Sequence, residues 1–90
     1  MAGGESYKVE IDPHAQHAFR KLSRDVQNRP TKVILALEHT PRPVSCKAVV
    51  GQPGYWRIRV GDYRVIYTVW DDVLVVLVVE LGHRRDVYRR

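Results

Sequence analysis

Three arginines alternate with apolar residues in the stretch WRIRVGDYRVIY, residues 56–67. The alternation predicts two short strands, and the Gly-Asp pair at 61–62 is typical of the two-residue turn of a tight hairpin. A turn there places Arg59 directly opposite Arg64, with Arg57 on the same face. Like charges opposed across a ladder destabilise a sheet by up to roughly 1 kcal/mol. We therefore expect an anion to bind at this face.

The guanidinium group suits phosphate chemistry. It is planar, it grips two phosphate oxygens at once, and it keeps its charge at physiological pH. The three arginines are thus predicted to stabilise the negative charge that builds up on a phosphate during transfer. The alternative is an exposed, solvated arginine face, which is common on small sheets, but the opposition of Arg59 and Arg64 favours the anion site.

The size and charge of the chain agree with an anionic partner. Ninety residues make one small domain with a thin core. Fifteen Lys and Arg stand against ten Asp and Glu, so the formal net charge is +5. That balance favours a polyanion such as nucleic acid, or an acidic protein.

Several classes of protein receive no support from the sequence. The single cysteine, Cys46, has no partner for a disulfide or a zinc site, which predicts a reducing, cytoplasmic setting. His14 and His17 share a helical face without a third ligand, so no metal or cofactor is expected. The longest apolar run, 73–79, is far shorter than the ~20 residues that span a bilayer, so no membrane span is expected. Residues 1–6 are predicted to be a disordered lead-in with no signal peptide.

The elements expected to position the arginines follow from periodicity and capping. Asp12 as N-cap and Pro13 at the first helical position predict a helix start. A second helix is predicted over 26–38 with Pro30 inside it, kinked in preference to a later start. The other predicted elements are a strand at 7–11, an extended link at 40–43, a short strand or irregular edge at 44–50, the hairpin at 55–70, a turn at 71–72 and a strand at 73–81. This β-α-α-β-β-β order predicts an α+β fold, with the N-terminal strand and the helical hairpin packed on one face of a mainly antiparallel sheet.

Alternation also divides the sheet into two faces. The residues expected to face the core are Trp56, Ile58, Val60, Tyr63, Val65, Tyr67 and Val69. The apolar residues expected on the arginine side are Trp70, Val73, Val75, Leu77 and Val79. An apolar patch of this kind indicates a partner site, unless the tail and residues 40–50 fold over it.

Two motifs together resemble a known protein family. GYWRIRVGDYRVIY at 54–67 and GHRRDVY at 82–88, in this order of elements, closely resemble the RelE/ParE superfamily of toxins from toxin–antitoxin modules, and the RelE branch in particular. The resemblance covers nearly the whole chain, and it implies a single RelE-like toxin domain over residues 7–90.

The resemblance implies a function. RelE-type toxins are ribosome-dependent endoribonucleases that cut mRNA in the A site and so inhibit translation. They use no metal: the 2′-hydroxyl attacks the adjacent phosphate. The implied partners are a cognate antitoxin protein and the ribosome, with operator DNA reached only through the antitoxin.

The resemblance also assigns candidate catalytic residues. Those that match the family's site are Arg57, Arg59, Arg64, Arg84 and Tyr88. Arginine at position 59, where the best-known member has lysine, removes a plausible general base, because a guanidinium keeps its proton. The match at Tyr88 also requires a gap, since the segment after Arg84 is shorter than in that member.

Other residues near the site are candidates for proton transfer and substrate contact. His83 is the side chain there that ordinarily titrates near neutrality, which makes it a candidate base. Tyr88 stacks on a base or takes part in proton transfer, with packing on the sheet as its alternative. Lys47 and Arg85 are candidate substrate contacts, with a plain surface role as the alternative for each.

Two other functions remain open. A ParE-like protein would inhibit DNA gyrase by binding, without chemistry, on the same fold. An inactive homologue would act only as co-repressor with its antitoxin, which the absence of a lysine at position 59 keeps possible.

Overall fold

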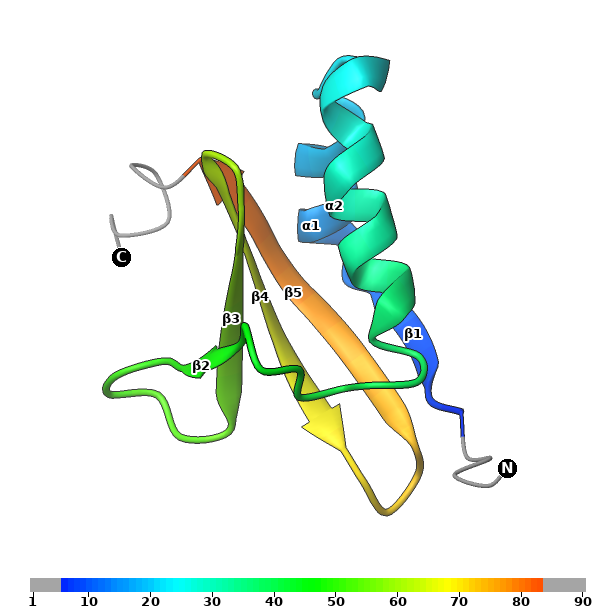
Figure 1. The fold of residues 1–90 in the computed structure, drawn as a ribbon, viewed down its shortest axis with the longest axis vertical. Coiled ribbons are helices and arrows are strands. Elements are labelled where there is room, and N and C mark those ends of the chain that lie inside the picture. The colour runs from blue at the N-terminus through cyan, green and yellow to red at the C-terminus, as the bar shows by residue number, and fades with distance from the viewer. Residues whose placement is uncertain (1–5, 84–90) are drawn as a thin grey trace.

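The α+β fold is confirmed in a computed structural model, which describes residues 6–83 and leaves 1–5 and 84–90 undescribed. The elements in chain order are β1 (Lys8–Ile11), α1 (Pro13–Arg20), α2 (Arg24–Ala36), β2 (Lys47–Ala48), β3 (Tyr55–Val60), β4 (Tyr63–Trp70) and β5 (Val75–His83). Figure 1 shows both helices on one side of the sheet. In the described part of the chain, no helix has the length and apolar character needed to cross a membrane.

The five strands form one sheet in the order β1-β5-β4-β3-β2. β1 runs parallel to β5, and the other pairs are antiparallel. The sheet is therefore mainly antiparallel, as predicted. The segment 44–50, predicted as a short strand or irregular edge, contributes only the two residues of β2.

Capping side chains set where the helices begin. The Asp12 carboxylate accepts a hydrogen bond of 2.8 Å from the backbone N–H of His14, and Pro13 opens α1 as predicted. Ser23 is the N-cap of α2, so this helix starts two residues earlier than predicted. It continues through Pro30, whose side chain is buried, so the later start is wrong.

The hairpin has the predicted register. Val60 pairs with Tyr63 and Arg59 pairs with Arg64, around a turn in which Gly61 has a φ of +62°. The core-facing prediction is also confirmed. Four of its side chains are buried, namely Ile58, Val60, Val65 and Tyr67; three others pack half-buried against them, namely Trp56, Tyr63 and Val69.

A β-bulge interrupts the pairing of β4 with β5. Ile66 pairs with Glu80 while the next residue, Tyr67, pairs with Val78, so Val79 has no opposite partner. An extra residue of this kind breaks the alternation of faces. Val78 and Leu81 both point into the core although they are three residues apart.

The link between α2 and β2 is fixed to the core side by polar contacts. The Tyr67 hydroxyl donates to the carbonyl of Pro41 at 2.8 Å, and burial raises the pKa of that phenol. The Arg42 guanidinium lies over the Trp56 ring and pairs with Asp71 at 2.7 Å. This hydrogen bond, with another from Tyr7, holds the pKa of Asp71 below its ordinary value.

The Tyr67 hydroxyl provides a first test of this attachment. Tyr67→Phe is expected to lower the free energy of unfolding by about 1 kcal/mol, because the Pro41 carbonyl loses its partner. Urea unfolding measures the change. Tyr55→Phe, on the exposed side of β3, is the matched control and should unfold like the parent; equal stability of both variants would contradict the contact.

Asp71 gives a pH-dependent test. Its lowered pKa means that the carboxylate stabilises the fold above the ordinary value of 3.8 and loses this effect as pH falls through the folded value. Asp71→Asn should therefore be less stable than the parent at pH 7, by a small amount because the group is exposed, and the difference should shrink below about pH 4. Asp72→Asn is the control for removal of a neighbouring charge. A stability difference that does not change with pH would refute the ion pair.

Candidate functional site

The sheet face turned away from the helices carries a row of cationic side chains. Lys47 of β2 pairs with Arg57 of β3, and Arg59 pairs with Arg64 of β4. Directly paired residues point to the same face, and neighbouring strands lie about 4.8 Å apart. The register therefore gathers four positive charges on one side of three adjacent strands.

Three of these side chains surround a hollow, which we call the basic hollow. It has a volume of about 260 Å³ and is lined by Ser45, Lys47, Arg57 and Arg59. Ammonium, guanidinium and hydroxyl groups all donate hydrogen bonds, and none of the described residues around the hollow carries a carboxylate. This donor set fits an anion with several oxygens, such as phosphate.

Arg64 does not fit the alternative interpretation, an exposed and solvated arginine face. The residue is 3 % exposed, whereas Arg59 opposite it is exposed. A charge removed from solvent is screened less by water and salt than an exposed one. Arg64 is thus placed to strengthen the positive potential beside Arg59.

His83 lies apart from the basic hollow. It is paired with Tyr63, whose side chain packs against the core, and the two rings meet edge to face with centroids 5.6 Å apart. Both residues line a different hollow, together with His14 and His17 of α1. His83 therefore lies on the helix side of the sheet, and its role as a base stays a prediction.

Three predicted site residues lie outside the described part of the chain: Arg84, Arg85 and Tyr88. Their roles stay predictions. Among residues 6–83, no group of three His, Cys, Asp or Glu side chains is arranged to hold a metal ion.

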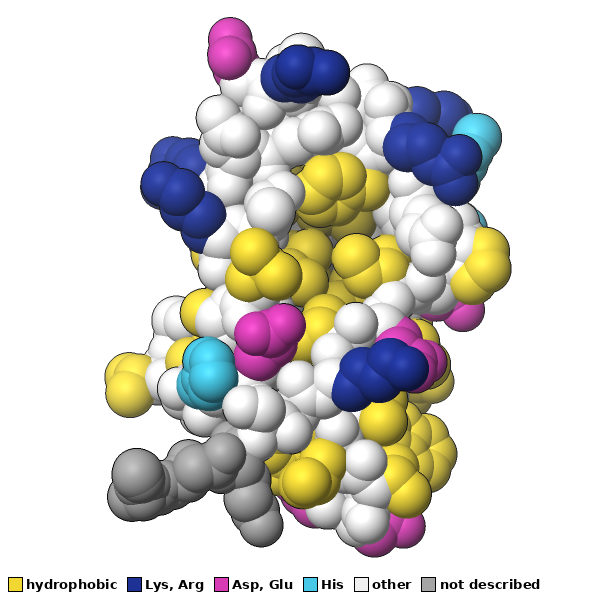
Figure 2. All heavy atoms as spheres, turned by 90° about the vertical axis from the view of Figure 1, so that its right-hand side faces the viewer, with side chains coloured by type: hydrophobic (Ala, Val, Ile, Leu, Met, Phe, Trp, Pro, Cys, Tyr) yellow, Lys and Arg dark blue, Asp and Glu magenta, His cyan; other side chains and the backbone are white. Residues whose placement is uncertain are grey.

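The opposite face has an apolar middle. Figure 2 views the helix side, where hydrophobic side chains occupy the middle and Lys and Arg side chains lie around them. Part of this face is a hollow lined by Ile11, Gln16, Phe19 and Arg20. The strongest candidate for an anion site is therefore the sheet face turned away from the helices, which we call the open face.

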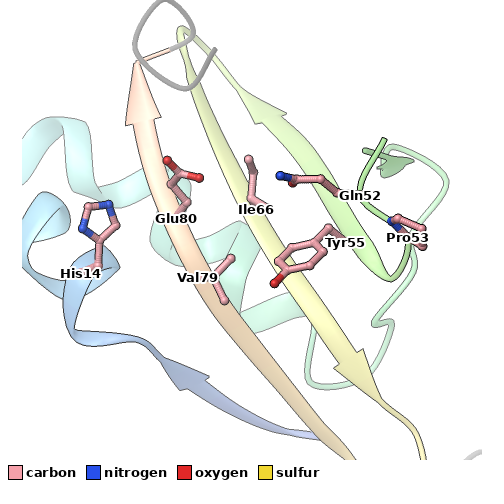
Figure 3. A pocket seen from close by; sticks show the side chains of 7 residues that line it. All are labelled: His14, Gln52, Pro53, Tyr55, Ile66, Val79 and Glu80. Carbon is pink, nitrogen blue, oxygen red and sulfur yellow. The ribbon is translucent and has the colours of Figure 1, made fainter. Parts of the chain in front are cut away.

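Sequence reasoning missed one part of the open face. A second hollow, of about 310 Å³, is lined by residues that include Tyr55, Ile66 and Glu80 (Figure 3). Its position depends on the β-bulge in the pairing of β4 with β5, and no local sequence pattern predicts that bulge. Ser45 was missed as well, because a serine in an irregular segment carries no signal of its own.

The sequence matches, over residues 9–88, the family described as the ParE toxin of the type II toxin–antitoxin system parDE. The chain belongs to this family of toxins. Relatives indicate the RelE branch of the RelE/ParE superfamily, as predicted. The chain is 29% identical over 87 residues to the mRNA interferase toxin RelE of Escherichia coli strain K12, and the match covers 92% of this chain and 90% of that protein.

Solved toxin structures have the same fold. The E. coli RelBE toxin–antitoxin complex matches with a TM-score of 0.77 at 28% identity, over 87% of this chain and 96% of that one. The archaeal RelE–RelB complex from Pyrococcus horikoshii matches with a TM-score of 0.78 at 28% identity, over 90% of this chain and 98% of that one. The fold prediction is confirmed by these structures as well as by the element order.

The basic hollow leads to a binding prediction. Arg59→Ala should weaken binding of the free toxin to a single-stranded oligoribonucleotide, and should lower the slope of log affinity against log salt by about 0.7, the contribution of one phosphate contact. Fluorescence anisotropy at several salt concentrations measures both. Arg24→Ala, which removes the same charge from the helix side, should leave the slope unchanged. Equal effects of the two variants would place the RNA elsewhere.

Proposed function

We propose that this toxin is a ribosome-dependent endoribonuclease that cleaves mRNA in the A site and so inhibits translation. The observation that carries the proposal is the basic hollow, with Lys47, Arg57 and Arg59 around a space of about 260 Å³. The likeness to a relative named as an mRNA interferase supports it.

The chemistry needs no redox partner or cofactor. The 2′-oxygen forms a bond to the adjacent phosphorus as the bond from phosphorus to the 5′-oxygen breaks. The products are a 2′,3′-cyclic phosphate and a free 5′-hydroxyl, and the proton lost by the 2′-hydroxyl is balanced by one gained by the 5′-oxygen. The phosphorane-like transition state carries more negative charge than the substrate. Fixed donors that match this state accelerate the reaction.

The arginines fit the stabilising part of this reaction. Arg57 and Arg59 line the basic hollow and would bind the non-bridging oxygens, while the buried charge of Arg64 adds to the potential beside them. Guanidinium groups do not remove a proton at physiological pH. Proton transfer is therefore assigned to another group, with Tyr88 as the candidate and Arg84 beside the leaving group. His83, the other candidate from the sequence, lies on the helix side of the sheet, away from the basic hollow.

The proposed partners are the ribosome and a cognate antitoxin. Structures of RelE bound to RelB antitoxins match this fold, which supports an antitoxin for this chain, and operator DNA would be reached only through it. The exposed side chains of Trp70 and Val73, with the half-buried Val75 and Leu77, leave apolar surface at the end of β4 and the start of β5. Such a surface suits a protein partner. The proposed setting is the cytoplasm, where ribosomes and messages meet.

Expression from a tightly controlled promoter, followed by mapping of mRNA 5′ ends, tests the activity. The parent toxin should produce cuts in phase with codons of translated messages. Arg59→Ala and Arg84→Ala should each reduce cutting about a hundredfold, the typical effect of removing one donor that stabilises transition-state charge. Arg24→Ala on the helix side is the control and should cut like the parent.

Inhibition of DNA gyrase is a second candidate function, because the matching family is named for ParE. In that case the toxin would bind DNA gyrase without chemistry, and expression would leave mRNA intact while changing plasmid supercoiling. An inactive homologue acting as co-repressor would change neither. Intact mRNA with altered supercoiling would overturn the nuclease in favour of the gyrase inhibitor.

A further inference from the structure

The basic hollow holds a nucleophilic amine beside two guanidinium groups. Lys47 of β2 pairs directly with Arg57 of β3, and Arg59, two residues further along β3, lines the same space. The Cβ atoms of directly opposed residues lie about 5 Å apart. Lysine is also the side chain that acylation modifies, because its amine forms an amide. The hollow therefore combines a group that can be acylated with groups that bind phosphate.

The Lys47 amine is open to reagents from solvent. The residue is exposed, and its strand is the edge strand of the sheet. The ion pairs described for residues 6–83 join Lys8 to Glu10 and Arg42 to Asp71, so no carboxylate in this part of the chain is paired with Lys47. The amine is thus accessible without first breaking an ion pair.

The two kinds of group in the hollow define the reagent that suits it. Guanidinium groups bind phosphate oxygens, whereas an amine reacts with an electrophilic carbon. An acyl phosphate carries both features, because its acyl carbon is joined to phosphorus through a single oxygen. Sites of roughly 300–1,000 Å³ hold drug-sized ligands. A space of about 260 Å³ suits a smaller molecule of this class.

We propose that Lys47 is a site of acylation by small acyl phosphates such as acetyl phosphate, which the basic hollow binds through their phosphate group. The unprotonated amine attacks the acyl carbon, and a nitrogen–carbon bond forms. The bond from that carbon to the bridging oxygen breaks, inorganic phosphate leaves with the electron pair, and the amine proton passes to phosphate or water. The product is an uncharged amide.

The neighbouring arginines promote this reaction in two ways. Arg57 and Arg59 stabilise the negative charge on the departing phosphate, as fixed donors do in other transfers. Binding of the phosphate also holds the acyl carbon next to the Lys47 amine, so that a bimolecular step becomes effectively unimolecular. Selectivity for Lys47 therefore depends on the phosphate of the reagent.

Acylation would reduce the charge of the open face. The amide has no positive charge, so Arg57, Arg59 and Arg64 remain of the four cations gathered by the register. Binding of single-stranded RNA should weaken, and the slope of log affinity against log salt should fall by about 0.7. This consequence rests on the proposed function, because it takes RNA as the ligand of the basic hollow. The acylation itself requires only that the hollow bind phosphate.

Two other lysines serve as references within the same molecule. Lys8 on β1 and Lys32 on α2 are both exposed, like Lys47. Neither lines the basic hollow, and Lys8 is paired with Glu10 at 3.7 Å. Exposure alone would let Lys32 react as readily as Lys47, whereas binding of the phosphate selects Lys47.

Mass spectrometry of the purified full-length toxin after incubation with acetyl phosphate tests the proposal. Lys47 should be acetylated about tenfold faster than Lys8 or Lys32, because it alone has the reagent held beside it. Added inorganic phosphate should slow the reaction at Lys47 only. Acetic anhydride, an acetyl donor without phosphate, should show no such preference. Equal rates at the three lysines with acetyl phosphate would overturn the proposal, and so would an equal preference for Lys47 with acetic anhydride.

A pair of variants tests the part of the arginines. Arg59→Gln should reduce acetylation of Lys47 by acetyl phosphate to about the rate of Lys8, and should leave its reaction with acetic anhydride unchanged. Arg24→Gln, which removes a charge from the helix side, should react like the parent. An unchanged rate at Lys47 in Arg59→Gln would contradict the assigned role. The competition by inorganic phosphate uses the parent protein, so it stands even if the variant does not fold.

RNA binding by the acetylated toxin tests the consequence. Fluorescence anisotropy at several salt concentrations should show the lower slope, and Lys47→Arg toxin treated in the same way should keep its own slope. Unchanged binding after complete acetylation of Lys47 would overturn the effect on RNA. Acetylation is measured without RNA or ribosomes, so its failure leaves the nuclease standing, and failure of the nuclease leaves the modification standing.

Discussion

The register of the β3–β4 hairpin is the constraint on which the rest of the structure depends. Gly61 takes the positive φ of the turn, and this fixes Arg59 opposite Arg64. A slip of one residue would turn every side chain of a strand to the other face. The arginines would then enter the core, and Ile58 and Val65 would enter solvent. Burial of the apolar residues thus holds the like charges together.

The two faces of the sheet have different roles: one packs against the core, and the other carries the candidate binding site. The helices and the link between α2 and β2 cover one face, where Tyr67 and its hydrogen bond to Pro41 lie. No helix formed by residues 6–83 lies over the other face (Figure 1). It holds the basic hollow and the hollow beside Glu80 on rigid strands, an arrangement that orders the groups before the ligand arrives.

Local patterns in the sequence predicted much of this structure, and long-range pairing decided the rest. Alternation and the Gly-Asp pair gave the hairpin, and Asp12 with Pro13 marked the start of α1. The bulge opposite Tyr67, the burial of Arg64 and the site of Glu80 depend on how β5 packs between β1 and β4. These strands are far apart in the sequence, so the pattern of neighbouring residues does not predict how they pack. The roles of Arg84 and Tyr88 came from family resemblance and, like the role of Arg85, stay predictions.

A crystal structure of the toxin with a 2′-O-methyl trinucleotide, which lacks the free 2′-hydroxyl that cleavage requires, tests the central claim most directly. The account predicts a phosphate in the basic hollow, within hydrogen-bond distance of Arg57 and Arg59, with the chain running along the open face of the sheet. An RNA bound across α1 and α2, with the basic hollow free of phosphate, would contradict it.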